Sequence, residues 1–356
     1  MHIIMSTFKD FSLPEMYETI RSSDILPEID RSIQWEPMRP MIRSLFHNNT
    51  EKGGRPNFDE IVMIKALFLQ GLYNIVDEKL EKELYDRISF HNFLHYPDKM
   101  PDARTLWALR ERMSRTGMDK HIWSELWKQL ESRGIVIRRG VIQDASFITS
   151  DHGKHGRKKP PAPDMPDPSE KQVPADRKEA KRQAGRSREE KKRLRKDERR
   201  ESMTRRSRDG SFAQKDGKNF FGYKQHSSHG VDLPLVREFV ITTASLHDSR
   251  VDLSMPGMPC YRDRGYQGAP CRGGINGTMD RASRNTPLTI KQVRRNLRIS
   301  RKRTPGERPY SVIKRVQNGG HTLVTMVRRV RVKMTFANMA YNLSTVVHMK
   351  RRGVIA

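Results

Sequence analysis

The first 130 residues carry apolar side chains at the spacing of amphipathic helices. Across residues 58–72 the apolar positions recur every three to four residues, and Asn57 is placed to cap the helix start. A later helix is predicted to begin at Asp102, which can cap it, and to turn Trp107 toward the core. We therefore predict an all-helical N-terminal domain over residues 1–130. Short helices of this kind build DNA-reading helix-turn-helix modules and also plain bundles, so the pattern leaves both open.

The pattern then changes to alternation. Residues 141–148 alternate and are rich in β-branched side chains, which predicts a strand. Further strands are predicted over residues 219–226 and 235–245, with a turn at residues 229–232 between them. A third apolar stretch ends at Asp263. Strands in this order, followed by helices, indicate a mixed α/β domain.

Helices return toward the C-terminus. They are predicted near residues 287–297 and 307–318, with a closing helix over residues 334–349. The Val- and Arg-rich residues 321–332 are typical of a strand. We assign residues 138–350 to one α/β domain, a mixed sheet with flanking helices.

A basic, Pro-rich segment interrupts this domain. Residues 152–208 contain 21 Lys and Arg against 10 Asp and Glu, and almost no large apolar side chains. Such a segment cannot bury enough apolar surface to offset the entropy lost on ordering. We therefore predict an inserted basic loop, partly disordered, over residues 150–215.

The whole chain is strongly basic, with a formal net charge of +27. This charge predicts a polyanionic partner, because cations that neutralise phosphates release condensed counterions. A basic surface kept for solubility is the alternative. No apolar run approaches the roughly 20 residues of a membrane-spanning helix, so no membrane association is expected. Cys260 and Cys271 are the only cysteines and form no disulfide or zinc pattern, which favours a reduced, cytoplasmic protein. Its expected binding to a polyanion adds an expected association with the nucleoid.

Three carboxylates stand out against this charge. Asp144 lies within an otherwise apolar strand, where an unpaired carboxylate is costly. Asp263 ends a short apolar stretch, and Glu307 is the only acid among 17 Lys and Arg in residues 289–352. Carboxylates at strand ends are suited to Mg²⁺, which phosphodiester chemistry uses. Each residue also has a structural interpretation: a solvent-facing strand residue, a turn residue and a capping-box glutamate, respectively.

Five segments resemble landmarks of IS-five type insertion-sequence transposases, in that family's order. They are VIQDAS, GYKQH, TTASLHDS, YRDRGYQG and RISRKRTPGERPYSVIKRV, and GGRPNFDEIVMIKALFLQGLYN resembles the family's leading helical domain. Arg303, Glu307 and Lys314 match the spacing of the family's third motif, whereas Ser300 stands where its tyrosine is expected. The chain is thus identified as a DDE transposase, and the resemblance implies a ribonuclease-H-like catalytic domain.

By this resemblance Asp144, Asp263 and Glu307 form the catalytic, metal-binding triad. It implies two Mg²⁺ ions, with Mn²⁺ as an alternative, that assist cleavage at the element's ends and attack of the freed 3′-hydroxyl on target DNA. The expected partner is DNA, bound by a homodimer. His226 and His229 are interpreted as loop or hairpin residues rather than metal ligands. The side chains expected to contact DNA are Arg303, Lys314, Arg308, Arg315, Arg264 and Lys224.

Three alternatives stay open. A catalytically inactive DNA-binding remnant would keep the basic surface and cut nothing. A non-transposing nuclease of the same fold would cut DNA and join no strands. A purely structural basic protein predicts that the three carboxylates are scattered in space.

Overall fold

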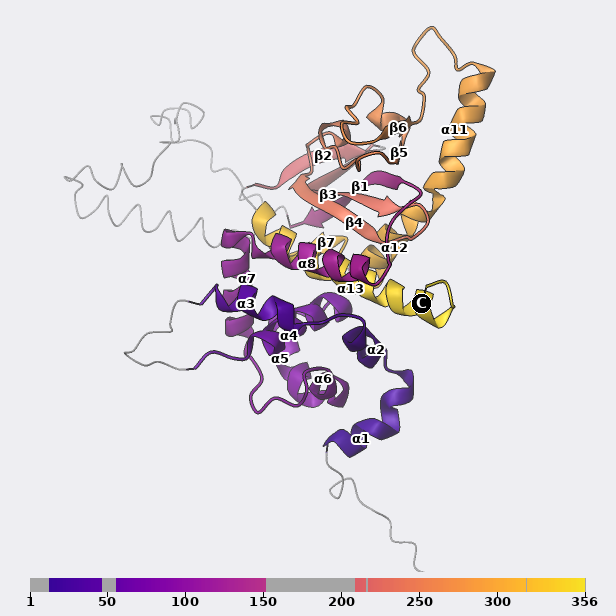
Figure 1. The fold of residues 1–356 in the computed structure, drawn as a ribbon. Coiled ribbons are helices and arrows are strands. Elements are labelled where there is room, and N and C mark those ends of the chain that lie inside the picture. The colour runs from indigo at the N-terminus through magenta and orange to yellow at the C-terminus, as the bar shows by residue number, and fades with distance from the viewer. Residues whose placement is uncertain (1–12, 47–55, 152–208, 216, 318, 356) are drawn as a thin grey trace, which may run out of the picture.

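The computed structural model describes residues 13–46, 56–151, 209–215, 217–317 and 319–355 (Figure 1). Most of the predicted basic loop lies outside these described residues. The N-terminal helices lie on one side of the molecule and a mixed sheet on the other, with a long C-terminal helix running between them (Figure 1).

The described N-terminal region is helical, as predicted. Its α-helices are α1 (Leu13–Ile20), α2 (Leu26–Arg31), α3 (Arg39–Arg43), α4 (Glu60–Tyr73), α5 (Asp77–Asp86), α6 (Ile88–Phe93), α7 (Ala103–Thr116) and α8 (Met118–Ser132).

Capping side chains explain where the two best-predicted helices begin. Asp59, rather than the expected Asn57, caps α4 by accepting hydrogen bonds from two backbone amides of its first turn. Asp102 caps α7, as predicted. The inward orientation predicted for Trp107 is wrong, because its side chain is 51% exposed at the edge of a cavity, whereas Leu109 is buried.

One mixed sheet follows, with strand order β2-β3-β1-β5-β6, β4 paired to β3 and β7 paired to β1. The antiparallel β1, β3 and β4 are joined by β5 and β6, which run parallel to β1, and this arrangement is ribonuclease-H-like. Two predictions need correction: β2 forms within the expected loop, and β3 continues into the expected turn. The strands are β1 (Val141–Ser150), β2 (Ser211–Lys215), β3 (Lys218–Gly230), β4 (Val236–Thr243), β5 (Pro259–Arg262), β6 (Ile275–Thr278) and β7 (His321–Thr322).

Three helices end the chain: α11 (Ile290–Arg303), α12 (Glu307–Arg315) and α13 (Val327–Arg351). The strand predicted over residues 321–332 is wrong beyond its first two residues, because α13 begins within this range. Arginines of its first turns pair with acids of α7 and α8, and the distance is 2.6 Å for both Arg329–Glu111 and Arg331–Asp119. None of the described helices, α13 included, is both long and apolar enough to cross a bilayer.

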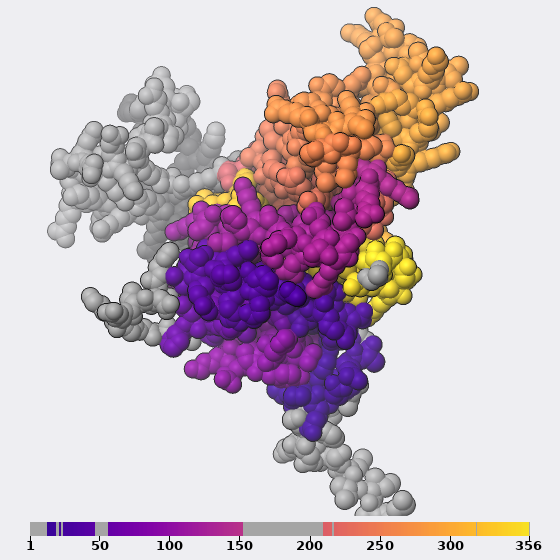
Figure 2. Space-filling model, viewed as in Figure 1, coloured from indigo at the N-terminus to yellow at the C-terminus, as the bar shows by residue number. Residues whose placement is uncertain are grey.

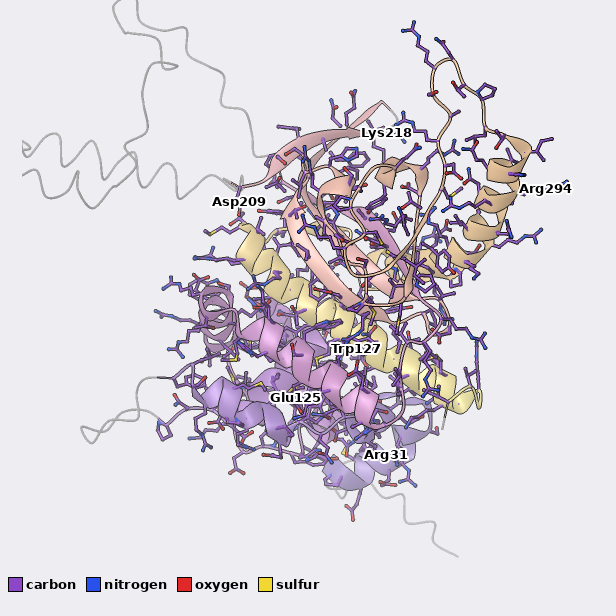
Figure 3. The ribbon with its side chains drawn as sticks, turned by 45° about the horizontal axis from the view of Figure 1, so that its top comes forward. Arg31, Glu125, Trp127, Asp209, Lys218 and Arg294 are labelled. Carbon is purple, nitrogen blue, oxygen red and sulfur yellow. The ribbon has the colours of Figure 1, made fainter. Side chains whose placement is uncertain are left out.

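A continuous core joins the helical region to the sheet. Buried side chains of the N-terminal helices share one cluster with Val141 of β1 and with the middle of α13. Gly71 of α4 lies so close to α13 that an added Cβ would be 2.8 Å from the carbonyl carbon of Phe336. Trp127 of α8 donates to the carbonyl of Val236 in β4 at 3.1 Å (Figure 3). The helical region and the sheet therefore share one buried core.

Candidate active site

Asp144 lies on β1, and Asp263 directly follows the neighbouring strand β5. β1 and β5 are parallel neighbours with Ile142 opposite Tyr261, and each aspartate lies two residues further along its chain. β5 ends at Arg262, so Asp263 is the first residue after the strand, and its charge acts on the Asp144 carboxyl group. The Asp263 carboxylate also accepts a hydrogen bond from the amide of Gly265 at 2.9 Å, which fixes the turn that follows β5.

The surroundings of Asp144 favour the protonated form of its carboxyl group. Burial raises its pKa, although 31% of the side-chain surface is exposed, and the charges of Asp263 and Asp248 raise it further. A hydrogen bond from the Ala145 amide and the guanidinium of Arg303 oppose this shift. Crowded carboxylates of this kind produce a local negative field that a divalent cation would relieve.

Arg303 and Tyr310 join the C-terminal helices to β1 beside Asp144. Arg303, the last residue of α11, places a guanidinium nitrogen 3.7 Å from the Asp144 carboxylate. Tyr310 of α12 donates to the backbone carbonyl of Asp144 at 2.7 Å, and its hydroxyl lies 2.6 Å from that of Ser227 on β3. Burial raises the pKa of Tyr310, so its phenol keeps the proton that it donates.

Glu307 is the first residue of α12 and is exposed. The Gly306 before it packs against Ile142, which brings the start of α12 within two residues of Asp144 along β1. The capping-box interpretation is not supported, because α12 has no side-chain cap and the Thr304 hydroxyl donates to a carbonyl of α11 instead. Within the described ranges no three His, Cys, Asp or Glu side chains form a metal-binding group, so the three acids are not gathered around one point.

Two family models match the chain. One, described as "Transposase domain (DUF772)", matches residues 14–112, and the other, "Transposase DDE domain", matches residues 138–343, more than half of the chain. This chain belongs to the DDE transposases of insertion sequences. The family assignment made from the motifs is therefore confirmed, while the IS-five subtype rests on the motifs alone. Searches of curated proteins and of solved structures each returned no match.

A second cation, Lys314, interacts with Asp144 in the transposase. Burial lowers the pKa of Lys314 and nearby Lys215 lowers it further, while the charge of Asp144 opposes this shift. Lys314 thus lies within electrostatic reach of Asp144. The predicted DNA-contacting cations that are exposed to solvent are Arg264, Arg308, Lys314 and Arg315.

Lys224, also predicted to contact DNA, is only 7% exposed in the transposase. Its ammonium donates to the Asp248 carboxylate at 2.7 Å and to the carbonyl of Leu246 at 2.8 Å. Because the Lys224 ammonium is buried and paired, it is not available to bind a phosphate. Asp248 was missed by the sequence-based prediction, although its charge acts on Asp144, and only its place in the TTASLHDS motif could have pointed to it.

His226 and His229 lie inside β3, not in a loop or hairpin turn, which corrects the prediction for both. The Nε2 atom of His226 lies 2.9 Å from the hydroxyl of Thr242, and that of His229 lies 3.0 Å from the hydroxyl of Ser227. Burial lowers the pKa of His226 to about 4 and that of His229 to about 3. Both imidazoles are therefore neutral near pH 7.

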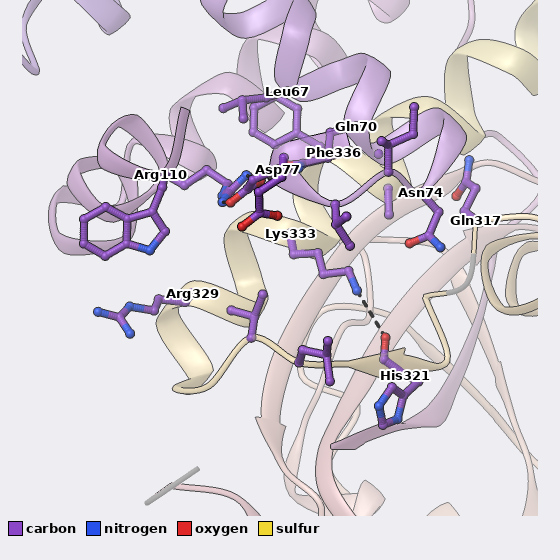
Figure 4. Close-up of a pocket in the computed structure, with 18 of the residues that line it drawn as sticks. Leu67, Gln70, Asn74, Asp77, Arg110, Gln317, His321, Arg329, Lys333 and Phe336 are labelled. Atoms are coloured by element: carbon purple, nitrogen blue, oxygen red, sulfur yellow. Dashed lines mark hydrogen bonds and ion pairs between the residues drawn. The ribbon is translucent and has the colours of Figure 1, made fainter. Parts of the chain in front are cut away.

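A cavity of about 520 Å³ lies away from the aspartate pair, lined by residues of α4, α7, α13 and the segment around β7 (Figure 4). Its charged side chains balance, because the lining contains the acids Asp77, Glu78 and Glu111 and the cations Arg110, Arg329 and Lys333. Arg110 pairs with Asp77, and Arg329 pairs with Glu111. Because these charges are compensated, the cavity does not favour a polyanion. The aspartate pair is the better candidate for an active site on DNA.

Replacing Gly306 with alanine is expected to push the start of α12 away from β1. The added Cβ would lie 2.7 Å from Cγ2 of Ile142, too close for an undistorted contact. Overpacking of this kind costs about 1–3 kcal/mol, more than the gain expected from alanine in a helical conformation. Urea denaturation checks the free energy of unfolding, and a double-mutant cycle with Ile142→Ala should show that removing Cγ2 relieves part of the cost. An unchanged stability of Gly306→Ala would contradict the close packing.

Proposed function

We propose that this transposase binds the ends of an insertion sequence, cuts DNA strands there with a divalent metal, and joins the freed ends to target DNA. The proposal rests chiefly on one observation: within the matched DDE domain, Asp144 of β1 and Asp263, which directly follows the neighbouring parallel strand β5, are close enough for the charge of Asp263 to act on Asp144. Acting on chromosomal DNA, it would work at the nucleoid, as a homodimer that holds two ends.

The residues around the pair fit a hard divalent cation. Carboxylate oxygens are the ligands that Mg²⁺ prefers, and one or two of them suffice when waters and substrate phosphates complete the coordination. Asp144 and Asp263 would hold the ion, and Glu307 at the start of α12, which is not gathered with them in this structure, would become the third ligand on metal binding. Bound there, Mg²⁺ or Mn²⁺ would supply activation of the attacking oxygen and stabilisation of the leaving oxygen.

The chain's own cations would bind and orient the DNA. Arg303 lies beside Asp144, so a phosphate at the aspartate pair would meet its guanidinium directly. Lys314, whose electrostatic interaction with Asp144 puts it nearby, would add a second cation, and the exposed Arg264, Arg308 and Arg315 would bind DNA further along. Lys224 has the different role of holding Asp248 in place.

The test is a DNA substrate that carries the gene's own flanking ends, incubated with a supercoiled target plasmid and Mg²⁺. We expect end cleavage and joined products with Mg²⁺, and neither product with EDTA. Cleavage without joining would indicate a non-transposing nuclease. Binding without cleavage would indicate an inactive remnant, and cleavage in EDTA would contradict the metal requirement.

A further inference from the structure

The helix α11 stands out from the rest of the transposase. Figures 1 and 2 show it projecting beyond the sheet at one end of the molecule. Its inner face is attached to the body: Ile299 is buried against Ile142 and Tyr261, and Lys302 donates to the hydroxyl of Tyr261 at 2.8 Å. Its last residue, Arg303, reaches Asp144. One end of α11 is therefore anchored at the candidate active site, while the other extends away from it.

The outer face of α11 carries exposed aliphatic side chains. Ile290 is 73% exposed, Val293 43% and Leu297 57%, and their spacing of three and four residues puts them on one stripe of the helix. Such large apolar side chains at adjacent positions on an open helix face usually mark a contact surface.

Arginines flank this stripe. Arg294, Arg298 and Arg301 are exposed, and no described residue forms an ion pair or hydrogen bond with their side chains. Figure 3 shows Arg294 on the side of α11 that faces away from the sheet. Over its 14 residues α11 has seven Lys and Arg and no acid.

We propose that the outer face of α11 lies in the major groove of the DNA next to the cleaved bond. This inference rests on the proposed function, since it places a second part of the protein on the same duplex. The charge of α11 is complementary to a polyanion, whereas the same helix of a second copy would bring seven like charges. A major groove admits one helix and offers thymine methyl groups to aliphatic side chains, while the flanking arginines reach phosphates and base edges.

The length of α11 sets the distance over which it contacts DNA. Its 14 residues span about 21 Å at 1.5 Å per residue. Because base pairs are spaced about 3.4 Å apart along the duplex axis and a helix in the groove is inclined to that axis, Ile290 at the far end is expected at most about six base pairs from the phosphate held beside Asp144.

The first test measures the salt dependence of binding to a random-sequence duplex in EDTA. The double variant Arg294→Gln/Arg298→Gln is expected to lower the slope of log K against log salt by about two, because each lost phosphate contact removes about 0.9. The control Lys350→Gln/Arg352→Gln removes equal charge from the exposed end of α13 and should leave the slope unchanged. A wild-type slope in the α11 variant would overturn the inference. If the wild-type protein did not bind DNA at all, the result would instead contradict the proposed function.

The second test separates DNA from a protein partner. Ile290→Ser/Leu297→Ser is expected to reduce the preference for the gene's own ends over random duplex, with the salt slope and the sedimentation coefficient unchanged. A change in oligomeric state with an unchanged preference would make the stripe a protein interface and overturn the inference. An iron chelate tethered to Cys at Ile290→Cys, in a Cys271→Ser background, should cut DNA within about six base pairs of the transposase's own cleavage site. The same chelate at Val354→Cys should not, and equal patterns from the two positions would also contradict the inference.

Discussion

Asp144→Asn is expected to lower the rate of DNA cleavage by about a thousandfold, because a metal ion supplies several kcal/mol of transition-state stabilisation and each 1.4 kcal/mol is a factor of ten. The amide keeps the size of the side chain and removes the charge that would hold the ion. DNA binding in EDTA should stay at the wild-type level, since the contacts to phosphates come from arginines and lysines. Single-turnover cleavage with end-labelled DNA measures the rate, and Asp86→Asn, on the exposed surface of α5, is the matched control.

The same substitution is expected to raise the stability of the metal-free protein. The pKa of Asp144 is raised in the folded state, first by burial, so the folded protein binds more protons than the unfolded chain between the two pKa values. The contribution of Asp144 to the free energy of unfolding therefore falls as the pH rises from its unfolded-state pKa to its folded-state pKa. At pH 7 the folded protein still bears the full free-energy cost of holding the Asp144 carboxylate ionised. Asp144→Asn removes that penalty. Wild-type cleavage, or a variant that unfolds more easily at pH 7, would count against this description of the site.

Acid is expected to destabilise the transposase through two buried histidines. His226 and His229 have folded-state pKa values of about 4 and about 3, lowered by burial, so below pH 6.5 the unfolded chain takes up protons that the folded protein does not. The neutral imidazoles make their full contribution to the free energy of unfolding above the pKa of histidine in the unfolded chain. This contribution is lost as the pH falls toward the folded-state pKa. Each histidine should lower the free energy of unfolding by about 2 kcal/mol between pH 7 and pH 5.

Urea denaturation at the two pH values measures this effect. His226→Gln and His229→Gln should each flatten the pH dependence, whatever they do to stability at pH 7. His121→Gln, which changes an exposed histidine of α8, should leave the pH dependence as in the wild type. If all three variants kept the wild-type dependence, the acid sensitivity would have to come from other groups.

Local patterns in the sequence predicted most of the regular structure. The apolar spacing that gave α4, the cap at Asp102 of α7, and the alternation of β1 all depend on residues close together in the chain. The start of α13 could not be predicted in this way. Its Val- and Arg-rich residues alternate as a strand would, and they form a helix because Arg329 and Arg331 pair with acids about 200 residues earlier.

In the candidate site, too, local sequence patterns predicted some residues, and tertiary contacts determine the others. Asp144 was identified because it interrupts an apolar strand, and Asp263 because it ends an apolar stretch, and the pairing of β1 with β5 brings the two near each other. The ion pair of Lys224 with Asp248 depends on a tertiary contact. No local sequence pattern distinguishes a buried, paired lysine from an exposed lysine that binds a phosphate. Glu307 was identified by its isolation among cations, and its exposed position leaves its role to experiment.

The most direct test of the proposed metal site compares Mg²⁺-dependent cleavage by the wild-type protein and by Glu307→Gln, on DNA that carries the gene's own flanking ends. We predict that Glu307→Gln loses cleavage and keeps DNA binding, because Glu307 is proposed as the third metal ligand and makes no contact that shapes the start of α12. Equal cleavage by the two proteins would contradict the three-carboxylate site and leave Glu307 as an exposed helix residue outside the reaction.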